Sequence, residues 1–321
     1  MTSGELKPNV QPPPASLRDG GPGGPSPDGK AWSRFGIAVS ALSLAFFGPL
    51  ATLLKLALAS DLHSHVLLVP WVAGYLVWIE RRRLPTAGPP AVGATVLLGI
   101  AAAGCVAAGW LPGAALPADL RLSLRIMALV LGVAGCGSAL LGRDIFRSCA
   151  FAFAFLGFLV PLPDGVVNLC ETALQHASAE AASWAFDAAG MPVIRDGLVF
   201  RLPGMTIKVA QECSGFRSTL VLFIVSVLAA RMFLLSTWKR AVLVAAIFPL
   251  GILRNALRIW VIATLSVDVD PDILNSWLHH RGGPLFFVVS LIPLYLLLWS
   301  LHRSERRSPQ ASDPRNSPPL T

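Results

Sequence analysis

Charged residues are scarce in this chain. Asp, Glu, Lys and Arg together make up 14% of the 321 residues, whereas hydrophobic residues make up 54%. A soluble domain usually contains about a quarter charged residues, so the composition excludes that class. Several apolar stretches reach the roughly 20 residues that an α-helix needs to cross about 30 Å of hydrocarbon. The sequence therefore predicts an all-α polytopic membrane protein.

Cysteines are few, and their number is odd. Three of the five, Cys105, Cys136 and Cys149, lie in or beside apolar segments, where a thiol packs as a small apolar group. Cys170 and Cys213 fall in, or at the edge of, one extramembrane stretch. The sequence leaves open whether these two form a disulfide.

Metal ligands and internal repeats are also lacking. No group of His, Cys and Asp residues has the spacing of metal ligands, so we expect no metal and no other cofactor. The sequence shows no clear internal repeat, which would favour a secondary transporter.

The net charge of +8 does not indicate a nucleic-acid partner, because the basic residues gather beside the apolar runs. The clusters are Arg81-Arg82-Arg83, Arg143 with Arg147, Lys239-Arg240, and Arg303 to Arg307. Such clusters are typical of the cytoplasmic loops of membrane proteins. We therefore expect no nucleic acid among the partners.

Eight apolar spans lie between two polar tails. The tails, residues 1–32 and 303–321, have compositions typical of disorder. The predicted membrane domain, residues 33–302, contains the spans 35–59, 64–80, 91–111, 121–142, 145–162, 214–235, 240–265 and 284–301. With both termini in the cytoplasm, nearly every basic cluster falls on the cytoplasmic side.

One long outer segment separates the fifth and sixth spans. Leu169 to Ala189 predicts a helix on the membrane surface or dipping into it. Val193 to Phe200 predicts a hairpin that turns at Asp196-Gly197, and Met205 to Val209 alternates like another short strand. We therefore expect a small extracytoplasmic helix and a β-ribbon that lead the chain to Cys213.

Cys213 lies at the outer start of the sixth span, within the polar sequence Gln211-Glu212-Cys213-Ser214-Gly215-Phe216-Arg217-Ser218. The N-terminus of a helix carries partial positive charge, which favours a thiolate. That placement suits a nucleophile. A polar helix cap with a passive cysteine fits this segment equally well.

Two arginines interrupt the seventh span. Arg254, followed by Asn255, lies roughly 21 Å beyond Arg240 along a helix, about two-thirds of the way to the outer face. Arg258 lies one turn further out, where snorkelling to the interface also explains it. An arginine inside a span costs at least about 2.5–3.5 kcal/mol on insertion scales. Such a residue is a functional-site hypothesis, and it suits stabilisation of a thiolate or an oxyanion.

His279 and His280 precede the eighth span on the same outer side. A histidine there can act as an acid, a base or a hydrogen-bond donor at neutral pH. Cys213, Arg254 and His279 would thus bring three reactive groups from three consecutive spans to one membrane face.

These motifs together resemble the exosortase and archaeosortase family, over roughly residues 35–301. The family pattern has a Cys-Ser-Gly core, an Arg-Asn pair in the next helix, and a later histidine or arginine. The chain supplies Glu212-Cys213-Ser214-Gly215-Phe216-Arg217, then Leu253-Arg254-Asn255-Ala256-Leu257-Arg258-Ile259, then His279 with Gly283 and Phe287.

Two earlier segments also resemble the family. They are Asp61-Leu62-His63-Ser64-His65 before Val69-Pro70, and Arg195-Asp196-Gly197 before Leu202-Pro203. Glu212, His63 and Pro284 depart from the residues that the family usually has, which leaves the subfamily and the sorting motif open.

The resemblance implies a catalytic site of Cys213, Arg254 and His279. Its supporting residues would be Ser214, Gly215, Arg217, Asn255, Arg258 and His65. Members of the family recognise exported proteins that end in a short sorting motif, an apolar helix and a basic tail. They are thought to cleave after the motif and to transfer the new carboxyl end to a membrane lipid or another acceptor, and some are associated with exopolysaccharide production.

We therefore expect a multi-pass enzyme of the bacterial inner membrane, with its site at the extracytoplasmic face. Cys213 would attack a peptide carbonyl and form an acyl-thioester. Arg254 would act electrostatically, because a guanidinium does not readily lose a proton. His279, or its neighbour His280, would assist proton transfer or stabilise the tetrahedral intermediate.

Two other classes remain open. One is a non-catalytic transporter or channel, in which Arg254 and Arg258 line a pore. The other is a membrane transferase of polysaccharide assembly, for which Asp61 with His65 is the nearest candidate pair. Replacement of Cys213 separates the cysteine enzyme from both.

Overall fold

The computed structural model describes residues 29–110, 116–202, 205–209, 215–268 and 283–307. The elements of the N-terminal half are α1 (Gly29–Ala45), α2 (Phe47–Ala59), η2 (Ser64–Leu67), α3 (Val69–Glu80), η3 (Arg81–Arg83), α4 (Val92–Trp110), α5 (Ala118–Leu140), α6 (Arg143–Ser148), α7 (Ala150–Phe155) and η4 (Leu156–Leu159). The remaining elements are α8 (Asp164–Ala188), β1 (Ile194–Asp196), β2 (Val199–Leu202), β3 (Met205–Lys208), α9 (Phe216–Phe233), α10 (Thr237–Ala245), α11 (Ile247–Asp268) and α13 (Gly283–Arg307).

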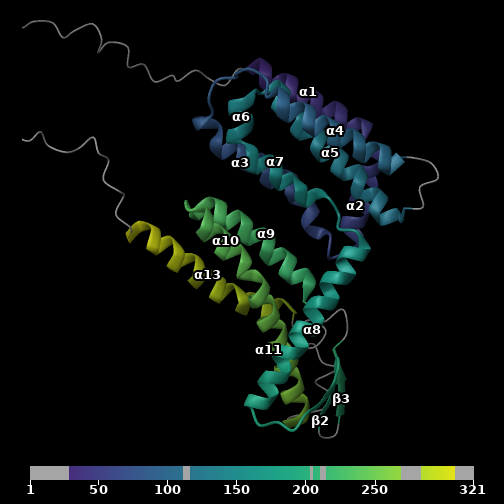
Figure 1. The fold of residues 1–321 in the computed structure, drawn as a ribbon, viewed down its shortest axis with the longest axis vertical. Coiled ribbons are helices and arrows are strands. Elements are labelled where there is room, and N and C mark those ends of the chain that lie inside the picture. Colours follow the sequence, from purple (N-terminus) through teal and green to yellow (C-terminus); the bar gives the residue numbers. More distant parts are fainter. Residues whose placement is uncertain (1–28, 111–115, 203–204, 210–214, 269–282, 308–321) are drawn as a thin grey trace, which may run out of the picture.

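The helices form two groups, joined by α8 (Figure 1). Five helices are long and apolar enough to span a membrane: α4, α5, α9, α10 continued by α11, and α13. Among the described residues the count rises to seven if α1 with α2, and α7–η4 with α8, each form one bent span. The predicted all-α polytopic class is thereby confirmed, whereas the count of eight stays a prediction.

The second predicted span, residues 64–80, contains a helix that is shorter than a membrane span. Its helix, α3, has 12 residues. At 1.5 Å per residue it is roughly 18 Å long, whereas the hydrocarbon core is about 30 Å thick.

Proline explains two breaks within spans that the sequence predicts as continuous. The first lies between α1 and α2, which bend by 76°, and the second lies between α10 and α11. Pro49 and Pro249 follow these breaks. Because proline has no N–H, the carbonyls of Ala45 and Ala245 lose their usual helical partners, and the helix is interrupted there.

The long segment after the fifth predicted span also differs from expectation. The chain bends by 91° between η4 and α8, at the prolines Pro161 and Pro163. Helix α8 begins at Asp164, earlier than the surface helix expected from Leu169, and it continues for 25 residues. It is therefore a long arm that leaves the helical groups (Figure 1).

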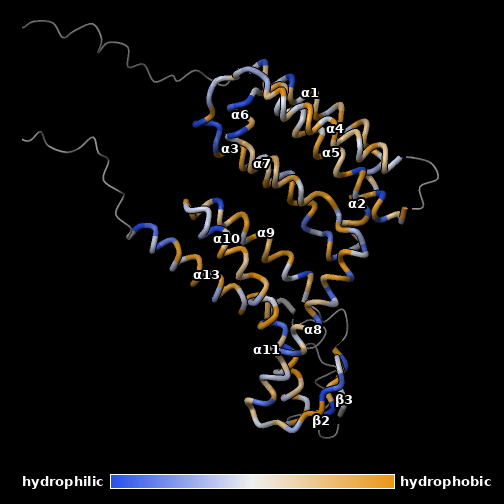
Figure 2. Tube along the Cα trace, viewed as in Figure 1, coloured by the Kyte–Doolittle hydropathy of each residue, from blue (hydrophilic) through white to orange (hydrophobic). Residues whose placement is uncertain are grey.

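Hydrophilic ends of α3, α6, α10 and α13 gather on one side of the molecule (Figure 2). Their polar contacts agree with this arrangement. Lys239 Nζ donates to Ser304 Oγ at 2.6 Å, and Glu305 accepts hydrogen bonds from the backbone N–H groups of Leu235 and Ser236. Basic ends on one side of a bundle are typical of one membrane face.

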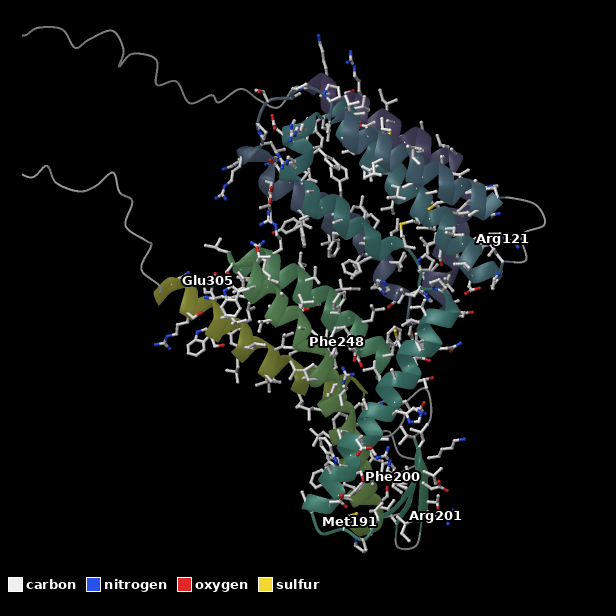
Figure 3. All side chains as sticks on the ribbon, in the orientation of Figure 1. Arg121, Met191, Phe200, Arg201, Phe248 and Glu305 are labelled. Atoms are coloured by element: carbon white, nitrogen blue, oxygen red, sulfur yellow. The ribbon has the colours of Figure 1, made fainter. Side chains whose placement is uncertain are left out.

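At the other end of the molecule, α11 extends a helix that is longer than the hydrocarbon core of a membrane. The continuous span of α10 and α11 has 31 residues, or roughly 46 Å, which exceeds the hydrocarbon thickness. The C-terminal part of α11 runs beside α8 and the strands (Figure 1). Their shared core contains Phe186 of α8, Phe200 of β2 and Ala263 of α11. Figure 3 labels Phe200 between the helices and the sheet.

The three strands form an antiparallel sheet in the order β1-β2-β3. Gly197 begins the two-residue turn between β1 and β2 with φ +60°, a conformation that glycine adopts without steric cost. Phe200 and Leu202 of β2 are buried, whereas Arg201 is exposed on the opposite face. One face of the sheet therefore packs on α8 and α11, and the other faces solvent.

Helix α9 is held at both ends by the segment that contains α3. Arg217 near its start pairs with Asp61, Nη1 to Oδ2 at 2.8 Å, and Arg231 near its end pairs with Glu80 at 2.6 Å. Between the pairs, apolar residues of α3, α7 and α9 form one cluster. The first turn of α9 thus lies beside the loop that carries the Asp61 motif.

Candidate active site

The site is built around Gly215, which precedes the first turn of α9. Its φ of +72° lies in the left-handed region, where a side chain is disfavoured. Its carbonyl oxygen accepts four hydrogen bonds: from the Thr219 N–H at 3.0 Å, from the hydroxyls of Ser218 and Thr219 at 3.1 and 2.9 Å, and from Arg254 Nη2 at 2.9 Å. This carbonyl therefore ties the start of α9 to α11.

Arg254 and Asn255 present two buried N–H groups beside Gly215. Their exposed fractions are 7% and 2%. Arg254 Nη2 also contacts Thr219 Oγ1 at 3.3 Å, but within the described part of the chain Arg254 Nη1 and Asn255 Nδ2 have no hydrogen-bond partner. A buried polar group without a partner costs about 1–3 kcal/mol, so these groups call for a functional explanation.

Close approach of α9 and α11 brings these groups to the glycine. A Cβ at Gly215 would lie 2.8 Å from Arg254 Nη2 and 3.4 Å from Asn255 Cγ. A Cβ at Gly251 of α11 would lie 2.6 Å from Thr219 Oγ1. Glycine at both positions therefore allows the helices to meet closely, as small residues do between membrane helices.

The chain is also fixed on the other side of residues 210–214. The Val209 N–H donates to the Leu198 carbonyl at 2.9 Å, and Gln175 Nε2 of α8 donates to the Val209 carbonyl. Gln175 and Val209 are both buried. Val209 before this stretch and Gly215 after it are thus each held by the frame of α8, α9 and α11.

The structure places the sequence-predicted residues in three sets. Arg254, Asn255 and Gly215 meet, as described above. Arg217 is exposed in its pair with Asp61, and Arg258 is half-buried one helical turn beyond Arg254. Three further predicted positions, Cys213, Ser214 and His279, lie outside the described residues, as does His280.

The Asp61 loop contributes two histidines on the same side as the start of α9. His65 is half-buried, and its Nδ1 lies 3.0 Å from the Leu62 carbonyl. His63 is buried, and its Nε2 has no hydrogen-bond partner among the described residues. Burial lowers the pKa of His63 from its ordinary value, and the charge of His65 lowers it further, while Asp164 partly opposes the shift. His63 is therefore neutral at neutral pH.

Three residues of the site frame were not found from the sequence. Thr219, Gly251 and Gln175 contact the site through side chains or close packing from different helices. The spacing of Gly215 and Thr219, one turn apart, was the signal available for Thr219. Nothing local distinguishes Gly251 or Gln175.

The chemistry of the described site is that of an anion-binding group. Arg254 and Asn255 supply N–H donors, which suit a thiolate or a developing oxyanion. Within the described residues no three His, Cys, Asp or Glu side chains form a group that could hold a metal ion. Cys170 on α8 forms no disulfide with another described cysteine.

The fold and this donor pair define a multi-pass membrane protein with a buried cationic site beside the start of a helix. A family model described as transmembrane exosortase matches residues 57–296, and the chain therefore belongs to the transmembrane exosortase family. Family membership indicates a protein-sorting transpeptidase of the membrane. Comparisons with curated proteins and with solved structures give no match.

Proposed function

We propose that this chain is a membrane-embedded cysteine transpeptidase that cleaves the C-terminal sorting signal of exported proteins. The observation that carries the proposal is a pair of buried groups, Arg254 Nη1 and Asn255 Nδ2, that have no hydrogen-bond partner among the described residues. Other atoms of the same two side chains, Arg254 Nη2 and Asn255 Cγ, lie against Gly215, only two residues after Cys213 in the sequence. Buried donors without partners suit an oxygen that carries negative charge only during a reaction.

Cys213 is the proposed nucleophile. It precedes α9, whose N-terminus favours an anionic thiolate, and a nearby guanidinium adds to that preference. The four cysteines in the described residues are placed differently: Cys149 is buried between α6 and the six-residue helix α7, and Cys105, Cys136 and Cys170 are half-buried within helices.

In the proposed reaction the Cys213 thiolate attacks the carbonyl carbon of the scissile peptide bond. The carbonyl oxygen becomes an oxyanion, which accepts hydrogen bonds from Arg254 and Asn255. The C–N bond then breaks, and the leaving amine takes a proton from His279, so that an acyl-thioester remains on Cys213. An acceptor nucleophile then attacks the thioester carbonyl and gives its proton to His279, and the C–S bond breaks to release the Cys213 thiolate.

The geometry of Arg254 explains why arginine serves this role. One nitrogen, Nη2, is occupied by the Gly215 carbonyl and by Thr219, so the guanidinium is fixed in place. The other, Nη1, keeps its N–H groups available. A fixed donor contributes most to transition-state stabilisation, since no reorganisation is needed when charge develops.

The remaining predicted residues receive supporting roles. We assign Ser214 a supporting role next to the nucleophile; Gly215 forms the turn into α9, and Arg217 holds the first turn of α9 against Asp61. Arg258 lies one turn beyond Arg254, and His65 braces the Asp61 loop. These roles place the reaction near a membrane boundary, which we assign to the extracytoplasmic face of the bacterial inner membrane.

The proposed substrates are exported proteins that end in a short motif, an apolar helix and a basic tail. The apolar helix would place the motif at the depth where Arg254 and Gly215 meet. The new carboxyl end would pass to a membrane lipid or another acceptor. We also propose that this sorting accompanies exopolysaccharide production.

A tail reporter tests this function. The reporter is an exported protein that is encoded beside the gene for this chain and ends in an apolar helix and an Arg-rich tail. We expect immunoblots to show tail removal only in membranes that contain the chain. Tail removal at the same rate without the chain would refute the assignment.

The histidine doublet gives a second expectation. His279→Ala should lower tail removal by about a hundredfold or more, in the range of a lost acid–base group, whereas His280→Ala should lower it by less than about threefold. Quantitative immunoblots of the tail reporter measure both. A severe His280→Ala with a silent His279→Ala would transfer the role to His280, and two silent variants would contradict a histidine acid.

Gly190 and Gly215 have nearly the same backbone conformation. Alanine at each position therefore tests whether backbone strain alone, or the position of Arg254, affects tail removal. Gly190 has φ +66° with open space around its Cβ position, whereas Gly215 has φ +72° with Arg254 only 2.8 Å from that position. Either change to alanine costs about 1–2 kcal/mol in the free energy of unfolding. Only Gly215→Ala should also lower tail removal, by at least about tenfold, because it displaces the guanidinium.

Thermal melting in detergent and the tail reporter measure the two effects. Equal activities of Gly215→Ala and Gly190→Ala, at matched stability, would show that the position of Arg254 against Gly215 does not matter.

A further inference from the structure

Strand β3 is an edge of the sheet, and its outward backbone groups can be identified from the register. Phe200 pairs with Ile207, and the Val209 N–H donates to the Leu198 carbonyl. Because backbone groups in an antiparallel pair alternate in direction, Ile207 and Val209 face β2. The N–H and C=O groups of Thr206 and Lys208 therefore face away from β2, at an edge where the described strands end.

Side chains leave this edge open. Thr206 and Lys208 are exposed on the solvent face of the sheet, whereas Ile207 packs against the core shared with α8 and α11. No described strand pairs with this side of β3, so a backbone that approached in its plane would meet the outward N–H and C=O groups of Thr206 and Lys208. An unpaired strand edge is a ready template for another strand.

The opposite edge differs. Strand β1 is one residue shorter than β3. Its middle residue, Arg195, forms an ion pair with Glu180 of α8 and donates from Nε to the Gly197 carbonyl at 2.8 Å. The register leaves one outward-facing residue on β1, Arg195, whose side chain is tied to α8, whereas β3 presents two.

The β3 edge is also rigidly placed with respect to the site. Gln175 of α8 holds the Val209 carbonyl, directly after the strand. The chain from Lys208 to Cys213 is five residues long, so an extended path covers at most roughly 17 Å. A polypeptide paired with β3 would therefore lie beside a strand whose last residue, Lys208, is only five residues before the proposed nucleophile.

We propose that the free edge of β3 binds the substrate as an added strand, with the extended residues next to the scissile bond pairing with Thr206 and Lys208. This proposal rests on the proposed function. Pairing through the backbone fixes the direction and register of a peptide without reading its side chains. The edge would thus align the substrate chain, and other contacts would select its motif.

A protective edge is the competing explanation. Short edge strands that carry lysine commonly prevent pairing with other chains. In that case the Lys208 side chain matters and its N–H does not. Substitutions that remove one and keep the other distinguish the two roles.

Proline and alanine variants at the same positions provide this test. Thr206→Pro and Lys208→Pro each remove an outward N–H while the bonds from Ile207 and Val209 to β2 remain, which an edge strand tolerates. We expect each to slow processing of the tail reporter about tenfold through a higher KM, as the loss of one backbone hydrogen bond implies. Thr206→Ala and Lys208→Ala, which keep the N–H, should process the reporter within about twofold of wild type.

Photocrosslinking measures substrate binding at the β3 edge independently of the proline variants, so misfolding of those variants does not affect this measurement. In a Cys213→Ala background, the photocrosslinker benzoylphenylalanine at Thr206 should capture the tail reporter. The same crosslinker at Ile194, on the far edge of the same row and roughly 9.6 Å away across two strand spacings, should not.

The results distinguish failure of the edge proposal from failure of the proposed function. Proline variants that process normally, or equal crosslinking from Thr206 and Ile194, would overturn the edge proposal while leaving the role of Cys213 intact. Normal processing by Cys213→Ala would instead overturn the proposed function beneath it.

Discussion

Replacement of Cys213 by alanine is expected to abolish tail removal, with a loss of at least about a thousandfold, while the protein still inserts and accumulates. The magnitude follows from the role, because a reaction through an acyl-enzyme has no alternative path once the nucleophile is gone. The position of Gly215 against Arg254 Nη2 and Asn255 supports this role for the residue two positions earlier.

The other cysteines provide matched controls for that change. Cys105 and Cys136 are half-buried in apolar helices, Cys149 is buried, and Cys170 on α8 forms no disulfide with another described cysteine. Alanine at each should leave tail removal within about twofold, because none of the four has a part in the proposed acyl transfer. A Cys170→Ala variant as defective as Cys213→Ala would point to a disulfide between them rather than to a nucleophile.

The second large effect is expected for Arg254→Lys. We expect tail removal to fall by about a hundredfold or more, which is the usual loss of one oxyanion donor. Arginine holds the Gly215 carbonyl with Nη2 and keeps Nη1 free. Lysine carries its three N–H groups on one nitrogen, so it does not reproduce the planar, separated donors with which arginine reaches the carbonyl and the substrate.

Arg231→Lys is the control for charge-preserving replacement. Arg231 pairs with Glu80 at the other end of α9, and a lysine there keeps an ion pair. We expect normal tail removal from this variant, since exposed and half-exposed pairs contribute little. Pre-steady-state measurement should show slower acylation for Arg254→Lys at unchanged reporter binding. A variant with normal acylation would contradict the oxyanion role.

Much of the fold follows from the sequence because apolar length and proline act locally. The spans that became α4, α5, α9 and α13 are evident from composition, since each presents about 20 apolar residues. The interruptions before Pro49 and Pro249 have a local cause in the missing proline N–H, but they were not predicted, and Pro293 lies inside the unbroken helix α13.

The structure differs from the sequence prediction where packing between elements determines the course of a helix. The course of α8 depends on its packing with α11 through small residues such as Ala182 and Ala263, which no local pattern reveals. Hydropathy alone likewise assigned the segment of α3 to a full span, although the helix has 12 residues.

The residues of the candidate site also divide into those that the sequence reveals and those that only packing reveals. An arginine in an apolar run is conspicuous, so Arg254 and Asn255 could be selected directly. The roles of Thr219 and Gly251 could not, because they depend on how closely α9 approaches α11. The pair of Asp61 with Arg217 joins residues 156 positions apart, and only the folded chain brings them together.

The acyl-thioester is the most direct test of the proposed chemistry. Membranes containing the chain and the tail reporter would be quenched with acid during turnover, digested, and analysed by mass spectrometry. The account predicts a peptide containing Cys213 that carries the new carboxyl end of the reporter as a thioester, released by hydroxylamine and absent from Cys213→Ala. Turnover of the reporter with Cys213 unmodified at every time point, or an adduct on another residue, would contradict it.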